Sequence, residues 1–186
     1  MLSVAEALGG DVVVVAHSIG ATIALQALRR NDGLIRAAAL YEPPLPGIGT
    51  TDPSEAMIEA LDAGRDEEAL TIFLRDLVRL SDGEVAASRA SPMWPSRVAL
   101  IWTMRREGQS LSSHDHDPSQ YSEIDVPVQL LVGTNTAPHH TEAILALTQV
   151  IPDTETTVLE GQGHAALVQA PALVAGAITD LLRRID

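Results

Sequence analysis

A serine with the surroundings of an activated nucleophile stands near the start of the chain, in the segment Val15-Ala16-His17-Ser18-Ile19-Gly20-Ala21. The valines at 12–15 predict a strand buried on both faces of a parallel sheet, and the small residues after Ser18 predict a helix. Because the turn between them is tight, the positions two before and two after the serine must be small, and Ala16 and Gly20 meet that need. The segment predicts a strained turn that lifts the Ser18 hydroxyl above the carboxyl end of the sheet.

The same turn offers a donor for negative charge that develops during acyl transfer. The N–H of Ile19 lies at the start of the predicted helix, where the helix dipole favours an anion, so Ile19 is the candidate for the oxyanion hole. His17, directly before the serine, is a candidate for orienting the substrate. The alternative is that Ser18 only caps the helix. The full run of strand, small residue, His, Ser, any residue and Gly favours the nucleophile.

A histidine in a glycine-rich loop is the candidate base. The segment Leu159-Glu160-Gly161-Gln162-Gly163-His164 follows a predicted strand at 155–159 and precedes a predicted helix at 171–184. A histidine at the carboxyl end of a strand could reach Ser18, take its proton and return it to the leaving group. The alternative is a surface loop histidine, and the predicted position of Ser18 at the same end of the sheet favours the base.

The third residue of a catalytic triad should be a carboxylate that orients the histidine and stabilises its charged form. After the predicted strand ending at Gly133 the chain reads Thr134-Asn135-Thr136-Ala137-Pro138, without an acid. Asn135 could orient His164 but could not neutralise its charge. Glu42 follows the predicted strand at 35–41, one helix and one strand beyond Ser18. We therefore choose Glu42, against the alternative that it is a solvated loop charge.

Three further polar clusters carry weaker signals. The run His114-Asp115-His116-Asp117 has metal-ligand residue types but no regular element to fix them, so we interpret it as a polar loop and predict no metal site. Arg106, in Arg105-Arg106-Glu107, could orient a substrate, although a solvated helix face is the preferred interpretation. The pair His139-His140 is predicted to start a helix near the catalytic end of the sheet.

Composition excludes several classes of function. The chain has 186 residues, a net charge of −13 and no cysteine. Nucleic acid and anionic membrane surfaces would be repelled, and disulfides, thiolate chemistry and cysteine-based zinc sites are excluded. No stretch reaches the length of a membrane-spanning helix and the N-terminus does not resemble a signal peptide, so a cytoplasmic location is expected. The expected partner is a small ester-like molecule, with no cofactor.

Alternating strands and helices predict an α/β fold with a parallel sheet. Residues 1–44 and 126–186 are predicted to form its core, with strands at 12–15, 35–41, 128–132 and 155–159. Helices are expected at 3–8, 18–30, 141–150 and 171–184. Residues 45–125 show helical patterns and no strand pattern, with a polar loop at 109–122, and are interpreted as a helical insert.

Taken together, these segments resemble the α/β-hydrolase superfamily over nearly the whole chain, including the chain order Ser18, Glu42, His164. The resemblance implies an N-terminally truncated α/β-hydrolase fold, with a parallel sheet of about four strands, flanking helices and a helical cap insert. In similar small acyl-hydrolases an Asp usually stands at the position of Asn135. Some superfamily members place the acid one strand earlier, which agrees with Glu42.

The start of the chain departs from the family pattern. Only residues 1–10 and Asp11 precede the strand at 12–15, so the family order implies that four strands and the second oxyanion-hole donor are missing. Loss of one such donor typically costs about 2.7–4 kcal/mol of transition-state stabilisation. A misplaced gene start, a genuine fragment and a partner chain that completes the sheet remain alternatives. The strand at 12–15 becomes an exposed edge, which predicts possible homo-oligomers paired through it.

The function favoured by these residues is hydrolysis of a carboxylic ester or thioester by a Ser18-His164-Glu42 triad. One alternative is a catalytically impaired fragment or pseudoenzyme that acts as a binding module. Another is a cofactor-free haloperoxidase-like enzyme or a carbon–carbon bond hydrolase. These alternatives stay open because a fold does not determine a reaction.

Overall fold

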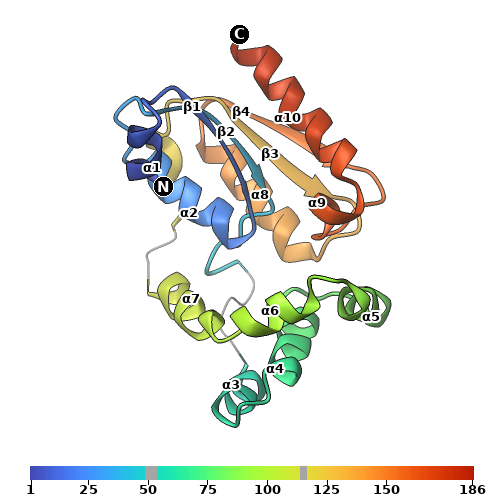
Figure 1. The fold of residues 1–186 in the computed structure, drawn as a ribbon. Coiled ribbons are helices and arrows are strands. Elements are labelled where there is room, and N and C mark those ends of the chain that lie inside the picture. Colours follow the sequence, from blue (N-terminus) through green and yellow to red (C-terminus); the bar gives the residue numbers. More distant parts are fainter. Residues whose placement is uncertain (49–53, 114–116) are drawn as a thin grey trace. The chain divides into compact units, whose positions relative to one another are not determined.

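Four parallel strands form one sheet in the computed structural model, which describes residues 1–48, 54–113 and 117–186 (Figure 1). The spatial order β1-β2-β3-β4 follows the chain order, with strands β1 (Val12–His17), β2 (Ile35–Tyr41), β3 (Val128–Gly133) and β4 (Thr154–Leu159). The predicted α/β class and the number of strands are confirmed for the described part of the chain.

Helices cover both faces of this sheet (Figure 1). One face is packed by α1 (Leu2–Ala7), α2 (Ile19–Leu28) and α8 (Pro138–Val150). The other face is packed by α9 (Ala166–Gln169) and α10 (Pro171–Ile185). Parallel strands need such cover on both sides because their connections cross over the sheet as helices.

The central strand β2 shows why the sheet is buried on both faces. Its side chains alternate with period two, so that Ala38 and Leu40 face the α2 and α8 side. Ala37, Ala39 and Tyr41 face the α10 side. All five are almost fully buried. The apolar residues of β2 therefore contribute to the cores on both faces of the sheet.

Helix α8 begins earlier than the sequence indicated. The structure starts it at Pro138 rather than at Thr141. A proline fits the first helical position because its missing N–H would have no acceptor there. His139 and His140 consequently lie in the first turn of α8, at the carboxyl end of the sheet, as predicted.

Strand β1 lies at one side of the sheet and pairs with β2 alone among the described strands. The side chain of Val15, in its middle, is 50% exposed. An open strand of this kind offers unpaired backbone groups to another strand. Pairing with a second copy of the chain stays a prediction.

The described chain divides into two compact units, Met1–Ile48 with His116–Asp186, and Gly49–Asp115. The described residues of the second unit contain helices and no strand: α3 (Glu55–Asp62), α4 (Asp66–Ile72), the π-helical η1 (Phe73–Leu77), α5 (Asp82–Ala90), α6 (Trp94–Leu100) and α7 (Thr103–Ser112). They bury a core of their own, which includes Met57, Leu70 and Trp94.

The prediction of a polar loop at residues 109–122 was partly wrong. Helix α7 continues through Gln109 to Ser112, and Pro118–Glu123 forms the short 3₁₀ helix η2 of the first unit. Extending an existing helix costs less free energy than starting one, so polar residues can prolong it. His114, Asp115 and His116 lie outside the described residues, and the prediction for them stays a prediction. Asp117 accepts a hydrogen bond from the Ser119 N–H at the start of η2.

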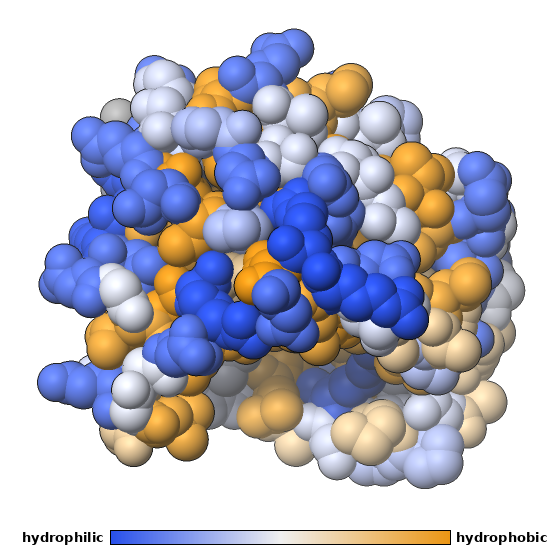
Figure 2. Space-filling view, turned by 90° about the horizontal axis from the view of Figure 1, so that it is seen from above, coloured by the Kyte–Doolittle hydropathy of each residue, from blue (hydrophilic) through white to orange (hydrophobic). Residues whose placement is uncertain are grey.

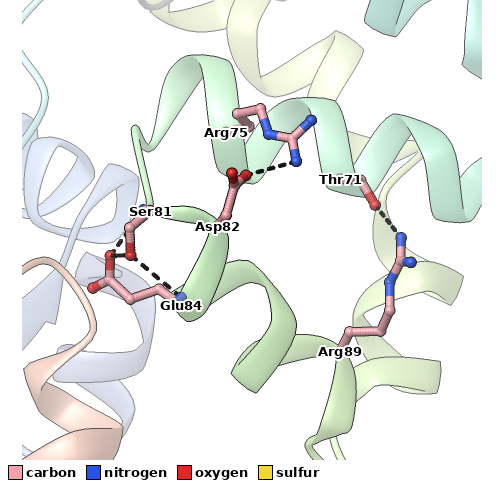
Figure 3. Close-up of polar contacts among 6 residues, drawn as sticks. All are labelled: Thr71, Arg75, Ser81, Asp82, Glu84 and Arg89. Atoms are coloured by element: carbon pink, nitrogen blue, oxygen red, sulfur yellow. Dashed lines mark hydrogen bonds and ion pairs between the residues drawn. The ribbon is translucent and has the colours of Figure 1, made fainter.

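Local polar contacts fix the ends of the helices in the second unit (Figure 3). Ser81 and Glu84 form a capping box at the start of α5, and Glu84 accepts from the Ser81 N–H at 2.9 Å. Nearby, Arg75 pairs with Asp82 at 2.9 Å. These groups are exposed, so each contact contributes at most about 1 kcal/mol to the unit.

The amino end of the sheet is charged and open to solvent. A pocket of about 330 Å³ is lined there by Arg36, Pro127, Asp153, Arg184 and Ile185. The face seen from above in Figure 2 carries mostly hydrophilic residues with hydrophobic ones between them. Within the described part of the chain, no helix combines the length and the apolar character needed to cross a membrane.

Candidate active site

Ser18 adopts a strained backbone conformation between β1 and α2, with φ 54° and ψ −132°. A positive φ is uncommon for residues other than glycine and costs about 1–3 kcal/mol, which the surrounding structure must offset. The Ser18 N–H donates to the carbonyl of Tyr41 at 2.9 Å and so ties the turn to β2. The hydroxyl makes no capping hydrogen bond to α2. Ser18 is thus the N-cap residue of α2 by position, but its side chain does not make the capping hydrogen bond that the alternative interpretation required.

The N–H of Ile19 opens α2 directly after this turn. Early N–H groups of a helix have no acceptor within the helix, and the helix dipole makes their surroundings favourable for an anion. The predicted need for a small residue at position 20 is not seen, because a Cβ built on Gly20 meets no atom within 4 Å in the described residues. The strain at this turn thus resides at Ser18 itself.

Glu42 is fully buried at the carboxyl end of β2. Its Oε1 accepts a hydrogen bond from the Gly133 N–H at 2.9 Å, and its Oε2 accepts from the Thr136 hydroxyl at 3.0 Å. The same Oε2 lies 2.6 Å from His164 Nδ1. A buried carboxylate is stable only when it is hydrogen-bonded in this way. The alternative that Glu42 is a solvated loop charge is therefore wrong.

The ring of His164 is oriented by Glu42, and its backbone is oriented by the loop before it. With Nδ1 donating to Glu42, Nε2 of the neutral ring is left as a proton acceptor. Tyr41 donates its hydroxyl to the carbonyl of Gly163. Asn135 donates from its side chain to the Gly161 carbonyl at 3.1 Å. Asn135 thus holds the loop of His164 and not its ring.

A close backbone approach brings this loop over the end of β3. A Cβ added to Gly133 would lie 2.1 Å from the carbonyl oxygen of Gln162. Gly133 also supplies the N–H that holds Glu42. Because position 133 has no side chain, the end of β3 can donate its N–H to Glu42 and also lie close to the loop of His164.

His17 lies against the other residues of this site. Its ring centroid is 4.4 Å from that of His164, with the two planes tilted by 42°. Its Nε2 lies 2.9 Å from the carbonyl oxygen of His164. His17 is therefore placed to fix His164, and its predicted contact with a substrate stays a prediction.

The sequence analysis gave no role to His140, yet its ring stacks on His164. The centroids are 4.4 Å apart and the planes differ by 11°. His140 is 3% exposed, and neither ring nitrogen has a hydrogen-bond partner in the described part of the chain. Burial, and then the charge of His164 and of neighbouring histidines, lowers the pKa of His140 to about 2, so its ring is neutral. The signal in the sequence that could have identified His140 was its position at the start of the helix that follows β3.

Tyr41 is the second residue that the sequence analysis missed. It is the last residue of β2, next to Glu42. Burial, and then the charge of Glu42, raises the pKa of its phenol well above the usual value. Tyr41 consequently stays protonated and donates to the loop of His164. Its position at the carboxyl end of a buried strand was the signal that could have identified it.

Arg106 belongs to the second unit and lies in α7. Its guanidinium is 5.7 Å from the centre of the Trp102 ring, an arrangement typical of a cation–π contact. Its neighbour Arg105 pairs with Asp62. The role of Arg106 with a substrate stays a prediction.

Three buried side chains of the site could hold a metal ion. One ligand atom from each of Glu42, His140 and His164 lies within 4.8 Å of the other two. The chemistry of the site thus combines a strained serine, a histidine with an anchored carboxylate, and a second histidine with unused nitrogens.

Comparison with known proteins identifies similar chains. The model of a family described as the alpha/beta hydrolase family matches residues 2–177. An alpha/beta hydrolase from Sphaerobacter thermophilus is 24% identical with a TM-score of 0.75, over 94% of this chain and 70% of that chain. A thermophilic esterase is 17% identical with a TM-score of 0.73, over 98% and 71% of the two chains.

An esterase from Rhodococcus sp. ECU1013 is 20% identical with a TM-score of 0.64, over 96% of this chain and 67% of that chain. The comparison with curated proteins gives no match. At these identities the solved structures are evidence for a shared fold.

Proposed function

Because the chain belongs to the alpha/beta hydrolase family, we propose that it is a serine hydrolase of carboxylic esters or thioesters. Ser18 is the nucleophile, His164 the base and Glu42 the acid that orients the base. The observation that carries the proposal is the 2.6 Å contact between His164 Nδ1 and the fully buried Glu42. It leaves Nε2 of His164 as the basic nitrogen, in the loop after β4, and Ser18 lies between β1 and α2 at the same end of the parallel sheet. The carboxyl ends of these strands lie together in Figure 1.

In the proposed mechanism, Ser18 Oγ attacks the carbonyl carbon of the substrate while His164 Nε2 takes the hydroxyl proton. The N–H of Ile19 donates to the oxyanion that forms. Glu42 stabilises the charged His164 without taking its proton. His164 then returns the proton to the departing alcohol or thiol, and an acyl group remains on Ser18.

Water completes the reaction by the same steps. His164 takes a proton from a water molecule, which attacks the acyl carbonyl, and returns it to Ser18 as the free acid leaves. Esters and thioesters suit this arrangement because an alcohol or a thiol leaves the tetrahedral intermediate more readily than an amine does.

A fluorophosphonate probe tests the activated serine, and a p-nitrophenyl ester tests hydrolysis. The wild type should be labelled and should release p-nitrophenol, whereas Ser18→Ala should do neither. Ser3→Ala, at an exposed serine of α1, is the matched control and should behave as the wild type.

An unlabelled wild-type protein would contradict the proposal and favour the binding module. Labelling at Ser18 without hydrolysis of esters or thioesters would instead favour a haloperoxidase-like or carbon–carbon bond hydrolase reaction.

A further inference from the structure

We propose that Glu42, His140 and His164 form a site for a divalent transition-metal ion of the Zn²⁺ type, and that the bound ion inhibits the hydrolase. The inhibition rests on the proposed function, whereas the binding of the ion does not. The three residues are 0%, 3% and 8% exposed. They come from the ends of β2 and α8 and from the loop after β4.

The distances between the three ligand atoms show that the side chains need to move only a little to coordinate one ion. The three ligand atoms lie within 4.8 Å of one another. Ligand atoms of a tetrahedral zinc site, about 2.1 Å from the ion, lie about 3.4 Å apart. Glu42 Oε2 and His164 Nδ1, 2.6 Å apart, therefore have to separate by about 0.8 Å, and the longer separations have to close by at most about 1.4 Å. Rotation of the two imidazole rings is the movement proposed for both changes. Glu42 is already held in place by Gly133 and Thr136.

The two unpartnered ring nitrogens of His140 are a separate observation that favours a bound ligand. Both oxygens of Glu42 and Nδ1 of His164 have partners, since Glu42 accepts three hydrogen bonds and His164 Nδ1 meets Glu42. His140 alone among these residues is buried with both nitrogens unsatisfied. Buried polar atoms without partners are rare because their lost hydration is not replaced. A metal ion bound by one of these nitrogens would replace it.

The donor set selects the class of ion. Two imidazole nitrogens and one carboxylate oxygen suit Zn²⁺ and similar transition metals. Mg²⁺ and Ca²⁺ prefer oxygen ligands and are expected to bind poorly. The carboxylate of Glu42 offsets one of the two positive charges of the ion.

The same coordination would remove the base. Binding through His164 Nδ1 requires that nitrogen to lose its proton, which moves to Nε2 as the tautomer changes. Nε2 then carries the proton and can no longer accept one from Ser18. The ion also draws Glu42 away from its role as partner of His164. Metal binding and hydrolysis are therefore mutually exclusive.

Isothermal titration calorimetry with ZnCl₂ tests the site, on protein without a polyhistidine tag. The wild type should bind one ion per chain, and MgCl₂ should give no binding. His140→Phe keeps a flat ring on His164 but removes both nitrogens, and should bind Zn²⁺ at least about tenfold more weakly. His139→Phe, at the preceding residue, should bind as the wild type does. His140→Gln is the second variant if the phenylalanine prevents folding, and should weaken binding likewise.

The inhibition is measured on ester hydrolysis at increasing Zn²⁺. The wild type should lose activity as Zn²⁺ increases and recover it with EDTA. In His140→Phe, with inhibition measured against that variant's own metal-free rate, the Zn²⁺ concentration that inhibits should be at least about tenfold higher. Ser18→Ala should bind Zn²⁺ like the wild type, although it is inactive. Undetectable binding, or equal binding by wild type and His140→Phe, would overturn the site. An inactive wild type that binds Zn²⁺ through His140 would overturn the proposed hydrolase and leave the site standing.

Discussion

Charged side chains gather at both ends of the sheet, but the two ends place them in different surroundings. At the carboxyl end, Glu42 and His164 are buried and 2.6 Å apart. At the amino end, Arg36 lies 3.7 Å from Asp11 and 3.5 Å from Asp186, and the side chains of these two acids are 83% and 71% exposed. Water screens the second group, whereas the first depends on fixed donors.

Backbone strain alone does not separate the two ends. Ser18 and Glu42 have positive φ at the carboxyl end, but Asp11 at the amino end also has φ 54°. What distinguishes the carboxyl end is that Glu42 combines its positive φ with full burial and three hydrogen-bond partners, whereas the side chain of Asp11 is 83% exposed. This difference predicts that substitutions at the carboxyl end affect catalysis and stability strongly, and that substitution of Arg36 at the amino end affects neither much.

The largest expected effect is that of His164→Ala. Without the base, ester hydrolysis should fall by at least about 10⁴-fold in kcat, because residues of a triad act as a unit. Steady-state kinetics on a p-nitrophenyl ester measure the loss. A variant that kept a tenth of the wild-type rate would show that the carboxyl end is a structural cluster and not a catalytic one.

Glu42→Gln should lower kcat by roughly 10³-fold, because an amide can orient His164 but cannot stabilise its positive charge. Asn135→Ala, which removes one hydrogen bond to the loop of His164, is the matched comparison and should lose less than about tenfold. The two rates are compared at the same pH and substrate. The opposite ranking would transfer the role of third residue to Asn135.

Gly133→Ala should destabilise the protein by about 3 kcal/mol, because its methyl group meets the backbone carbonyl of Gln162 and not a flexible side chain. Urea unfolding gives the free energy of unfolding. Gly20→Ala is the control, since a Cβ there meets no neighbour within 4 Å in the described residues, and should change stability by less than about 1 kcal/mol. Equal effects would mean that the loop moves freely away from β3.

The buried His140 should make the wild type sensitive to mild acid. Its pKa is lowered to about 2, so between that pH and about 6.5 the unfolded chain binds a proton that the folded chain does not. Stability therefore falls as the pH decreases through this window, by about 2 kcal/mol between pH 7 and pH 5. His140→Phe should lack this part of the loss when both proteins are unfolded with urea in EDTA. Parallel curves for the two proteins would contradict a neutral buried ring.

The smallest effect is expected at the amino end of the sheet. Arg36→Ala should cost less than about 1 kcal/mol and should leave kcat unchanged, because its ion pairs are largely exposed. The cost should shrink further in high salt. A large loss of stability in Arg36→Ala that did not depend on salt would contradict the difference between the two ends of the sheet.

Part of this site could be predicted from the chain because its signals are local. The valines before Ser18, the small residues after it and the proline-limited strand before Glu42 specify strands, a helix and their order. In a parallel sheet, residues that follow successive strands lie at one end, so the pattern alone predicted that Ser18, Glu42 and His164 share that end.

Only the tertiary structure decided which groups touch. Glu42 contacts His164 across 122 positions of the chain. Asn135 holds the Gly161 carbonyl across 26 positions, and the His140 ring stacks on that of His164, 24 positions away. Such contacts follow from the register of strands and from the close approach at Gly133, which no periodic pattern encodes. Burial likewise emerges only when both helix layers pack on the sheet, and burial is what turns these polar residues into a site.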